Sequence, residues 1–222
     1  MSIALHIVFA IGALLLCVIP HEVAHGLVAL RLGDPTAKRA GRLSLNPLRH
    51  LDPIGSVLLP LALILVRRFT GLPILVFGWA KPVPINPYYF RDPWRGLVFV
   101  GLAGPGVNVF LAAMAASLAR LLYWAGVRGS LAYTFLAILV VVSLVIAFVN
   151  LVPLPPLDGS RILGYFLPVR WRLAFLRLEQ FGIVIVVALL LLGLLDLVLR
   201  GAEAVAVWML GEDLARLSGL WW

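Results

Sequence analysis

Two long stretches of this chain, residues 97–119 and residues 130–157, contain no Asp, Glu, Lys or Arg. Each is mostly apolar and longer than the about 20 residues that an α-helix needs to cross the hydrocarbon core of a bilayer. Only 13% of the 222 residues are charged and 63% are hydrophobic, so the chain lacks the polar surface that a water-soluble globule requires. The sequence therefore predicts an all-α polytopic membrane protein with about 4–6 transmembrane helices.

Two further apolar stretches add to the predicted spans. Residues 3–30 and residues 181–195 are long and apolar, and the second continues past Asp196. Residues 54–66 are short for a crossing, while residues 69–80 contain two glycines and a proline and favour an extended or re-entrant segment. Four crossings are expected, and a fifth depends on residues 54–66.

Three polar segments are not expected to cross the bilayer. Residues 40–45 and residues 81–85 are each followed by Asn-Pro and are predicted as short β-strands, the second confined to a sheet edge by its two prolines. Residues 201–222 mix acidic and basic side chains with tryptophans. This mixture is typical of a helix that lies in the membrane interface and is anchored by its aromatic end.

Nothing in the sequence divides the chain into separate domains. We expect one intramembrane domain over residues 1–222, with its core motifs in residues 20–160 and a C-terminal span and interfacial helix in residues 180–222. The first apolar stretch lacks the basic start and the small-residue cleavage site of a signal peptide, so we expect it to be retained. Cys17 is the single cysteine, which excludes an intrachain disulfide.

Basic residues exceed acidic ones by 18 to 10, which gives a net charge of +8. In a chain this apolar, the excess indicates cytoplasmic loops near lipid rather than a nucleic-acid partner. One flank of the predicted spans carries twelve basic residues and the other carries four: Arg31, Lys38, Arg39, Arg42, Arg49, Lys81, Arg91, Arg95, Arg161, Arg170, Arg172 and Arg177, against Arg120, Arg128, Arg200 and Arg216. The positive-inside rule places the first group in the cytoplasm and the N-terminus outside the cell membrane.

The pattern His-Glu-x-x-His occurs at His21, Glu22 and His25, towards the cytoplasmic end of the first predicted span. Chance alone produces it in roughly one chain in a thousand of this composition. On a helix, two histidines four residues apart share a face and can bind one metal ion, while Glu22 can reach a water molecule bound to that ion. Two imidazoles and a carboxylate in hydrocarbon are costly unless a cation compensates them.

A catalytic zinc ion usually has three protein ligands and one open position. Residue type leaves six candidates for the third ligand: His6, Cys17, His50, Asp52, Asp158 and Glu179. His6 lies about 22 Å from His21 along a helix, which is too far. Cys17 is one turn before His21 and is not excluded by spacing, although a small core residue is the simpler interpretation.

Asp158 has the strongest context of the six candidates. It ends the uncharged stretch that contains Asn150, after three prolines that interrupt the helix and immediately before Gly159. This arrangement places a carboxylate on irregular backbone at the edge of the membrane. A cap for the following helix is the alternative role.

The two motifs together resemble those of the site-2 protease family of intramembrane zinc metalloproteases. His-Glu-x-x-His-Gly at residues 21–26 precedes Asn-x-x-Pro-x-Pro-x-Leu-Asp-Gly at residues 150–159, in the order that the family shows. Further strings are similar to its small prokaryotic branch, which lacks PDZ and CBS domains; they lie at residues 33–37, 41–47, 50–53, 77–83 and 103–108.

The resemblance implies a role for each motif residue. His21, His25 and Asp158 are expected to bind one Zn²⁺ per chain, and Glu22 is expected to act as the general base. Asn150 is similar to a family residue implicated in active-site function, with a packing amide between helices as the alternative. Asn108 follows a Gly-Pro-Gly string, where packing between closely spaced helices is favoured over a substrate contact.

We therefore expect an intramembrane zinc metalloendopeptidase that hydrolyses peptide bonds of transmembrane proteins or peptides, with its active site towards the cytoplasm. An adaptor protein or a second copy of the chain are further candidate partners. A helical substrate must unwind before cleavage, and either predicted strand offers an edge with which it can pair. The alternatives are a metal transporter or sensor, which leaves Glu22 unexplained, and a non-catalytic membrane scaffold.

Overall fold

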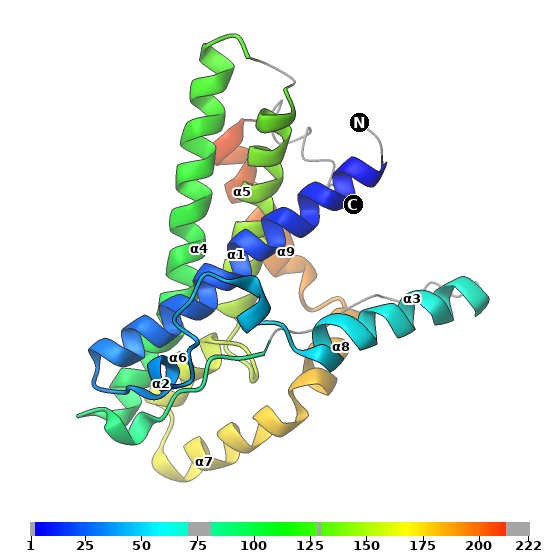
Figure 1. The fold of residues 1–222 in the computed structure, drawn as a ribbon. Helices are drawn as coiled ribbons and strands as arrows, with labels where there is room; N and C mark the ends of the chain where they lie inside the picture. Colours follow the sequence, from blue (N-terminus) through cyan, green and yellow to red (C-terminus); the bar gives the residue numbers. More distant parts are fainter. Residues whose placement is uncertain (1–2, 71–80, 128–129, 212–222) are drawn as a thin grey trace.

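The computed structural model describes residues 3–70, 81–127 and 130–211, and it confirms an all-α membrane architecture (Figure 1). Three helices are long and apolar enough to span a bilayer: α1 (Ile3–Arg31), α4 (Pro93–Trp124) and α5 (Leu131–Asn150). A fourth span is available if the pair Val169–Phe181 and Val184–Leu191, bent by 80°, crosses as one unit. Within the described residues the structure thus has three candidate crossings, or four with the bent pair, against the predicted four to six.

The three long helices pack through small side chains. Their shared core includes Ala13 of α1, Ala112 and Ala116 of α4 and Ala137 of α5, all nearly or fully buried. Small residues let helix backbones approach closely, which supplies the van der Waals contact that associates helices in lipid. Larger side chains on the outer faces stay exposed, as expected for surfaces that contact lipid.

Local sequence signals explain where α4 and α5 begin. The Asp92 carboxylate accepts hydrogen bonds from the backbone N–H groups of Trp94 and Arg95, each at 3.1 Å, and Pro93 occupies the first helical position. At the start of α5, the Ser130 hydroxyl accepts from the N–H of Tyr133 at 3.2 Å. After α5, a proline-rich loop leads to α6 (Gly159–Phe166).

Shorter elements connect the long helices and extend beyond them. The helices are α2 (Thr36–Arg39), α3 (Leu59–Thr70), α7 (Val169–Arg177), α8 (Gly182–Leu191) and α9 (Asp196–Leu210), with 3₁₀ turns at Pro47–Arg49, Pro87–Tyr89 and Leu178–Phe181 and a π-helical segment at Pro53–Leu58. With 12 residues, α3 is too short to cross a bilayer alone. The re-entrant segment predicted for residues 69–80 lies mostly outside the described residues.

The two predicted β-strands are wrong: residues 40–45 and 81–85 form no strand in the described structure. The backbone N–H groups of Gly41 and Arg42 donate to carbonyls of α2 and close the end of that helix, so they cannot enter a sheet. In the second segment, the Lys81 N–H donates to the His50 carbonyl at 2.9 Å, and the Val83 N–H donates to a side chain of α1. Pro82 and Pro84 have no N–H to donate.

The C-terminal prediction also needs correction. The apolar stretch from residue 181 to residue 199 is divided, because Gly193 adopts a φ of +65° and α8 ends there. The N–H of Leu194 donates to the carbonyl of Leu189 in the arrangement that a glycine permits at a helix C-terminus.

Residues 201–210, the described part of the predicted interfacial helix, belong to α9. This helix buries Ala202, Ala206 and Leu210 in the core beside α5. The aromatic end predicted at residues 212–222 lies outside the described residues.

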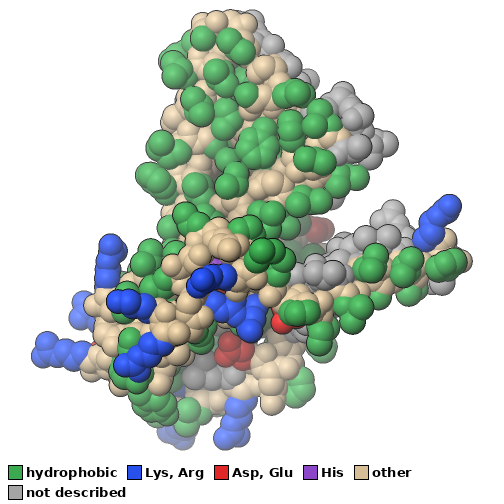
Figure 2. Space-filling view, viewed as in Figure 1, with side chains coloured by type: hydrophobic (Ala, Val, Ile, Leu, Met, Phe, Trp, Pro, Cys, Tyr) green, Lys and Arg blue, Asp and Glu red, His purple; other side chains and the backbone are tan. Residues whose placement is uncertain are grey.

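Charge is unevenly distributed over the surface. Figure 2 shows Lys and Arg side chains gathered around the lower part of the molecule, where α1 ends and α2 lies, whereas on the same face the upper part, with α4 and α5, presents hydrophobic side chains. This separation matches a protein whose upper part is surrounded by lipid and whose basic flank meets the headgroups.

Candidate metal centre

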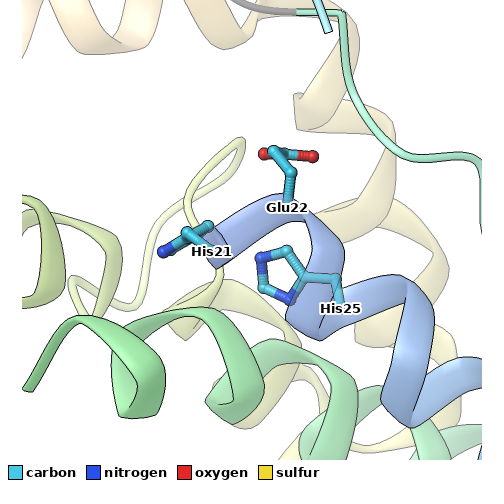
Figure 3. A group of neighbouring side chains, drawn as sticks. All are labelled: His21, Glu22 and His25. Carbon is cyan, nitrogen blue, oxygen red and sulfur yellow. The ribbon is translucent and has the colours of Figure 1, made fainter. Parts of the chain in front are cut away.

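The helix α1 presents His21 and His25 on one face, one turn apart. Their rings are nearly perpendicular, with centroids 4.6 Å apart, and each residue is about 4% exposed. Glu22 projects from the same turn in a different direction (Figure 3). The candidate ligand atoms of the three side chains all lie within 4.8 Å of one another, so the helix alone brings together a group that can hold a metal ion.

Asp158 completes the cluster from a distant part of the sequence. Its Oδ2 lies 3.0 Å from His21 Nε2 and 3.1 Å from His25 Nε2, and the residue is 6% exposed. The loop between α5 and α6, which contains a cis Pro155–Pro156 peptide, carries this carboxylate to the face of α1.

The carboxyl group of Asp158 is held in its ionised form. Burial by itself raises the pKa of such a group, but the hydrogen bonds to His21 and His25 and the positive charge of Arg161, 3.5 Å away, hold the pKa of Asp158 well below its usual range. An ionised carboxylate beside two imidazoles is a suitable set of ligands for a divalent cation.

Gly104 allows α4 to cover the two histidines. A Cβ atom at this position would lie 2.4 Å from His21 Nε2, 2.5 Å from His21 Cε1 and 2.6 Å from His25 Cε1. Real Cβ atoms do not approach other heavy atoms this closely, so only glycine leaves room for both rings. The backbone of α4 therefore forms one wall of the site.

A backbone group of α4 also orients His25. The carbonyl of Val100 accepts a hydrogen bond from His25 Nδ1 at 2.6 Å. If a metal ion replaces the proton on Nε2, this bond keeps the remaining proton on Nδ1 and leaves the Nε2 lone pair to the ion. Histidines that bind metals are usually held in this way by a second hydrogen bond on the other ring nitrogen.

Glu22 is held in place by the segment that follows residue 80. Its Oε2 accepts a hydrogen bond from the Val83 N–H at 3.0 Å. The same segment is fixed by Asp34, a fully buried carboxylate whose Oδ2 accepts from the Asn86 N–H at 2.7 Å. Glu22 thus has a defined position near the histidines while one carboxylate oxygen remains uncommitted among the hydrogen bonds of the described residues.

The donor set fits a zinc ion. Ligand atoms about 2.0–2.1 Å from a tetrahedral zinc lie roughly 3.4 Å from each other. The observed separations of 3.0 and 3.1 Å between the imidazole nitrogens and Asp158 Oδ2 need only a small outward movement to reach that spacing. Two neutral imidazoles and one carboxylate are among the ligand sets that catalytic zinc sites use.

The other five candidates for the third ligand lie outside this cluster, and three of them bind other groups. His50 Nε2 lies 2.7 Å from the Ser44 carbonyl, and Asp52 Oδ1 accepts from the N–H of Gly55 at 2.7 Å. The Cys17 thiol pairs with the Ser143 hydroxyl at 3.0 Å. His6 is near the beginning of α1 and Glu179 is exposed in the turn before α8.

The two asparagines singled out in the sequence occupy different environments. Asn150, at the end of α5, donates from Nδ2 to the Ile146 carbonyl of its own helix at 3.0 Å. Asn108 is fully buried in α4, one turn beyond Gly104, and neither polar atom of its side chain has a hydrogen-bond partner within the described part of the chain. The described contacts of Asn150 do not include the histidine cluster.

Two groups that hold the site in place cannot be identified from the sequence. The Val100 carbonyl and the Val83 N–H are backbone atoms, which every residue carries, so side-chain patterns could not identify them. Gly104 was visible only as part of a small-residue string that favours close helix packing. Its contact with both histidines follows from the way in which α1 and α4 cross.

Comparisons with known proteins agree with this geometry. A sequence profile described as peptidase family M50 matches residues 125–193, which include α5 and the loop with Asp158. A Bacillus subtilis protein named "Putative zinc metalloprotease YwhC" is 38% identical over 174 residues, 76% of this chain and 74% of the relative.

Two mycobacterial relatives are named "Putative zinc metalloprotease Rip2". The Mycolicibacterium smegmatis protein is 32% identical over 195 residues, and the protein from Mycobacterium tuberculosis strain H37Rv is 33% identical over 191 residues. Each of these matches covers 83% of this chain and 67% of the relative. No solved structure matches the chain.

Proposed function

The chain belongs to peptidase family M50 and is a zinc metallopeptidase, and from this premise we propose that it cleaves peptide bonds within membrane-embedded segments of other proteins. The observation that carries the proposal is the place of the cluster. His21, His25 and Asp158 converge between α1, α4 and the loop after α5, two of which are helices that can span a membrane. A peptide bond that reaches them must enter from within or beside the bilayer.

In this proposal His21, His25 and Asp158 would hold a zinc ion, and the chemistry that such an ion would supply is Lewis acidity towards a water molecule and a peptide carbonyl. Glu22 accepts the proton of the attacking water on a carboxylate oxygen and passes it to the departing amine. The Val83 N–H holds Glu22 Oε2, so the other oxygen is directed to this task. The Val100 carbonyl keeps His25 in the correct tautomer.

The substrate class follows from the surroundings of the site. The exposed outer faces of α1 and α4 are apolar, so a segment that is itself apolar can approach them through lipid. Such a segment must lose helical hydrogen bonds locally before its carbonyl is accessible. We take a single-span membrane protein as the simplest substrate, presented alone, through an adaptor protein or beside a second copy of the enzyme.

Cleavage is tested with the purified full-length chain in lipid vesicles and a panel of single-span proteins with tags at both ends. We expect at least one to give a smaller fragment whose new terminus, read by mass spectrometry, lies inside its apolar segment. A zinc chelator should remove the activity and added Zn²⁺ should restore it. New termini found only in water-exposed loops would contradict cleavage within the membrane.

The orientation of the site is a separate prediction. The end of α1 and α2 carry the basic flank, so the positive-inside rule places them, and the nearby cluster, in the cytoplasm and the N-terminus outside the cell membrane. Cysteines in Lys38→Cys and Arg120→Cys variants are matched reporters for the two sides. We expect an impermeant thiol reagent to label intact cells at position 120 and not at position 38; the reverse pattern would contradict the orientation.

A further inference from the structure

Two buried polar groups, one on α1 and one on α4, have no hydrogen-bond partner among the described residues. They are the Nδ1 atom of His21 and the side-chain amide of Asn108, whose Oδ1 and Nδ2 are both unpaired. Asn108 is 0% exposed and His21 is 4% exposed. A buried polar atom that lacks a partner is costly, and such atoms are rare in folded proteins. Their joint presence in one helix interface needs an explanation.

The two groups lie in the same part of that interface. The Val100 carbonyl accepts from His25, and four residues later Gly104 faces His21 as well as His25. Residue numbers therefore rise along α4 as they fall along α1, which makes the helices antiparallel where they cross. Asn108 is four residues after Gly104, so it occupies the same face of α4 one turn further along.

The direction of the side chains brings the two groups towards each other. Side chains on an α-helix tilt towards its N-terminus. Asn108 therefore leans back to the level of Gly104, whose Cβ position is 2.5 Å from Cε1 of the His21 ring. Cε1 is bonded to Nδ1, and His21 leans in turn towards the preceding turn of α1. That turn contains Cys17, whose thiol is already paired with Ser143.

His25 shows which hydrogen bond His21 lacks. His25 donates from Nδ1 to the Val100 carbonyl at 2.6 Å and keeps Nε2 for the cluster. His21 also places Nε2 against Asp158, at 3.0 Å, but its Nδ1 has no acceptor. A metal-binding histidine almost always donates its second ring N–H to an acceptor, which fixes the tautomer and the ring orientation. The Oδ1 atom of Asn108 is an acceptor without a donor.

We propose that Asn108 is a positioning residue for the metal site. Its Oδ1 accepts a hydrogen bond from His21 Nδ1–H, directly after a small rotation of the amide or through one bridging water molecule. This bond keeps the His21 proton on Nδ1 and the lone pair of Nε2 directed at the ion. The role rests on the zinc site described above, and Asn108 does not itself touch the substrate or the ion.

Zinc affinity tests this role in the absence of any substrate, by competition between the full-length chain in detergent and a chromophoric chelator. We expect Asn108→Leu to bind Zn²⁺ about 10–100-fold more weakly than the wild type, the usual effect of losing a partner of a metal ligand. Asn108→Asp keeps an acceptor at the same place and should bind within about threefold of the wild type. Asn108→Ala makes the same deletion as leucine with a smaller side chain, should leucine prevent folding.

Two measurements separate positioning from simple packing. The bond to His21 forms when zinc takes the Nε2 atom of that histidine; in the zinc-free chain the Asn108 amide is unpaired, so Asn108→Leu should melt at or above the wild-type temperature. Ser143→Ala removes a buried hydrogen bond from the same bundle and should leave zinc affinity unchanged. Wild-type zinc affinity in both Asn108→Leu and Asn108→Ala would overturn the proposal, as would equal losses in Asn108→Asp and Asn108→Leu. Because no substrate is present, these results stand whether or not the protein cleaves within membranes.

Discussion

Glu22→Gln should lower the rate of peptide hydrolysis by about 10³-fold, the usual scale for the loss of a general base. That factor corresponds to about 4 kcal/mol of transition-state stabilisation. Zinc binding should persist, because Glu22 lies beside the ligands without being one of them in our account. Glutamine is nearly isosteric with glutamate, and its carbonyl oxygen can still accept the hydrogen bond from the Val83 N–H.

The measurement pairs two readings on the same purified sample: zinc content by elemental analysis, and the initial rate of fragment formation from a single-span substrate. Glu22→Ala is the companion variant, since it removes both the base and the bond to Val83 and should be no more active than Glu22→Gln. A Glu22→Gln variant that cleaves at the wild-type rate would remove Glu22 from the mechanism. The transporter alternative predicts no role for Glu22 in proteolysis at all.

Gly104→Ala should disrupt the metal site from a position that binds neither metal nor substrate. The added methyl group would occupy space 2.4–2.6 Å from atoms of His21 and His25, so the rings or the two helices must move apart. Both rings are fixed, by Asp158 and by the Val100 carbonyl, and cannot shift without leaving the cluster. We expect zinc affinity to fall by about 100-fold or more and stability by roughly 1–3 kcal/mol.

Gly106→Ala is a matched control on the same helix. A Cβ atom at Gly106 meets no atom within 4 Å apart from its chain neighbours and the backbone of its own helix, so the same added methyl group enters open space there. Zinc affinity should stay at the wild-type value, and helix propensity favours alanine slightly. Both variants are measured by chelator competition and by thermal unfolding. Equal zinc affinity in Gly104→Ala and the wild type would show that α4 does not approach the histidines as described.

The spanning helices and the group formed by His21, His25 and Asp158 could be predicted from the sequence because each has a strong physical signal. An uncharged stretch of more than about 20 apolar residues is long enough to cross a bilayer and too apolar to face water. His21 and His25 are related by helical spacing alone, so their shared face follows once the segment is helical. Asp158 was identified by its context of prolines and apolar residues, and the structure places it against both histidines.

The connecting segments could not be predicted as well, because their backbone groups bind partners that are distant in sequence. Residues 81–85 look like an edge strand by composition, but the Val83 N–H is taken by Glu22, 61 positions earlier. Gly193 in the C-terminal apolar stretch is compatible with a continuous span, yet its positive φ ends α8. In both places a tertiary contact or one backbone angle outweighed the local pattern.

X-ray absorption spectroscopy of the zinc-loaded chain tests most directly whether His21, His25 and Asp158 hold a zinc ion between membrane-spanning helices. We expect nitrogen and oxygen ligands at about 2.0–2.1 Å, with the outer-shell scattering of two imidazoles and no sulfur. The imidazole signal should fall by half in His25→Ala. A sulfur ligand at about 2.3 Å, which only Cys17 or a methionine could provide, or a spectrum without imidazole scattering, would contradict the assignment.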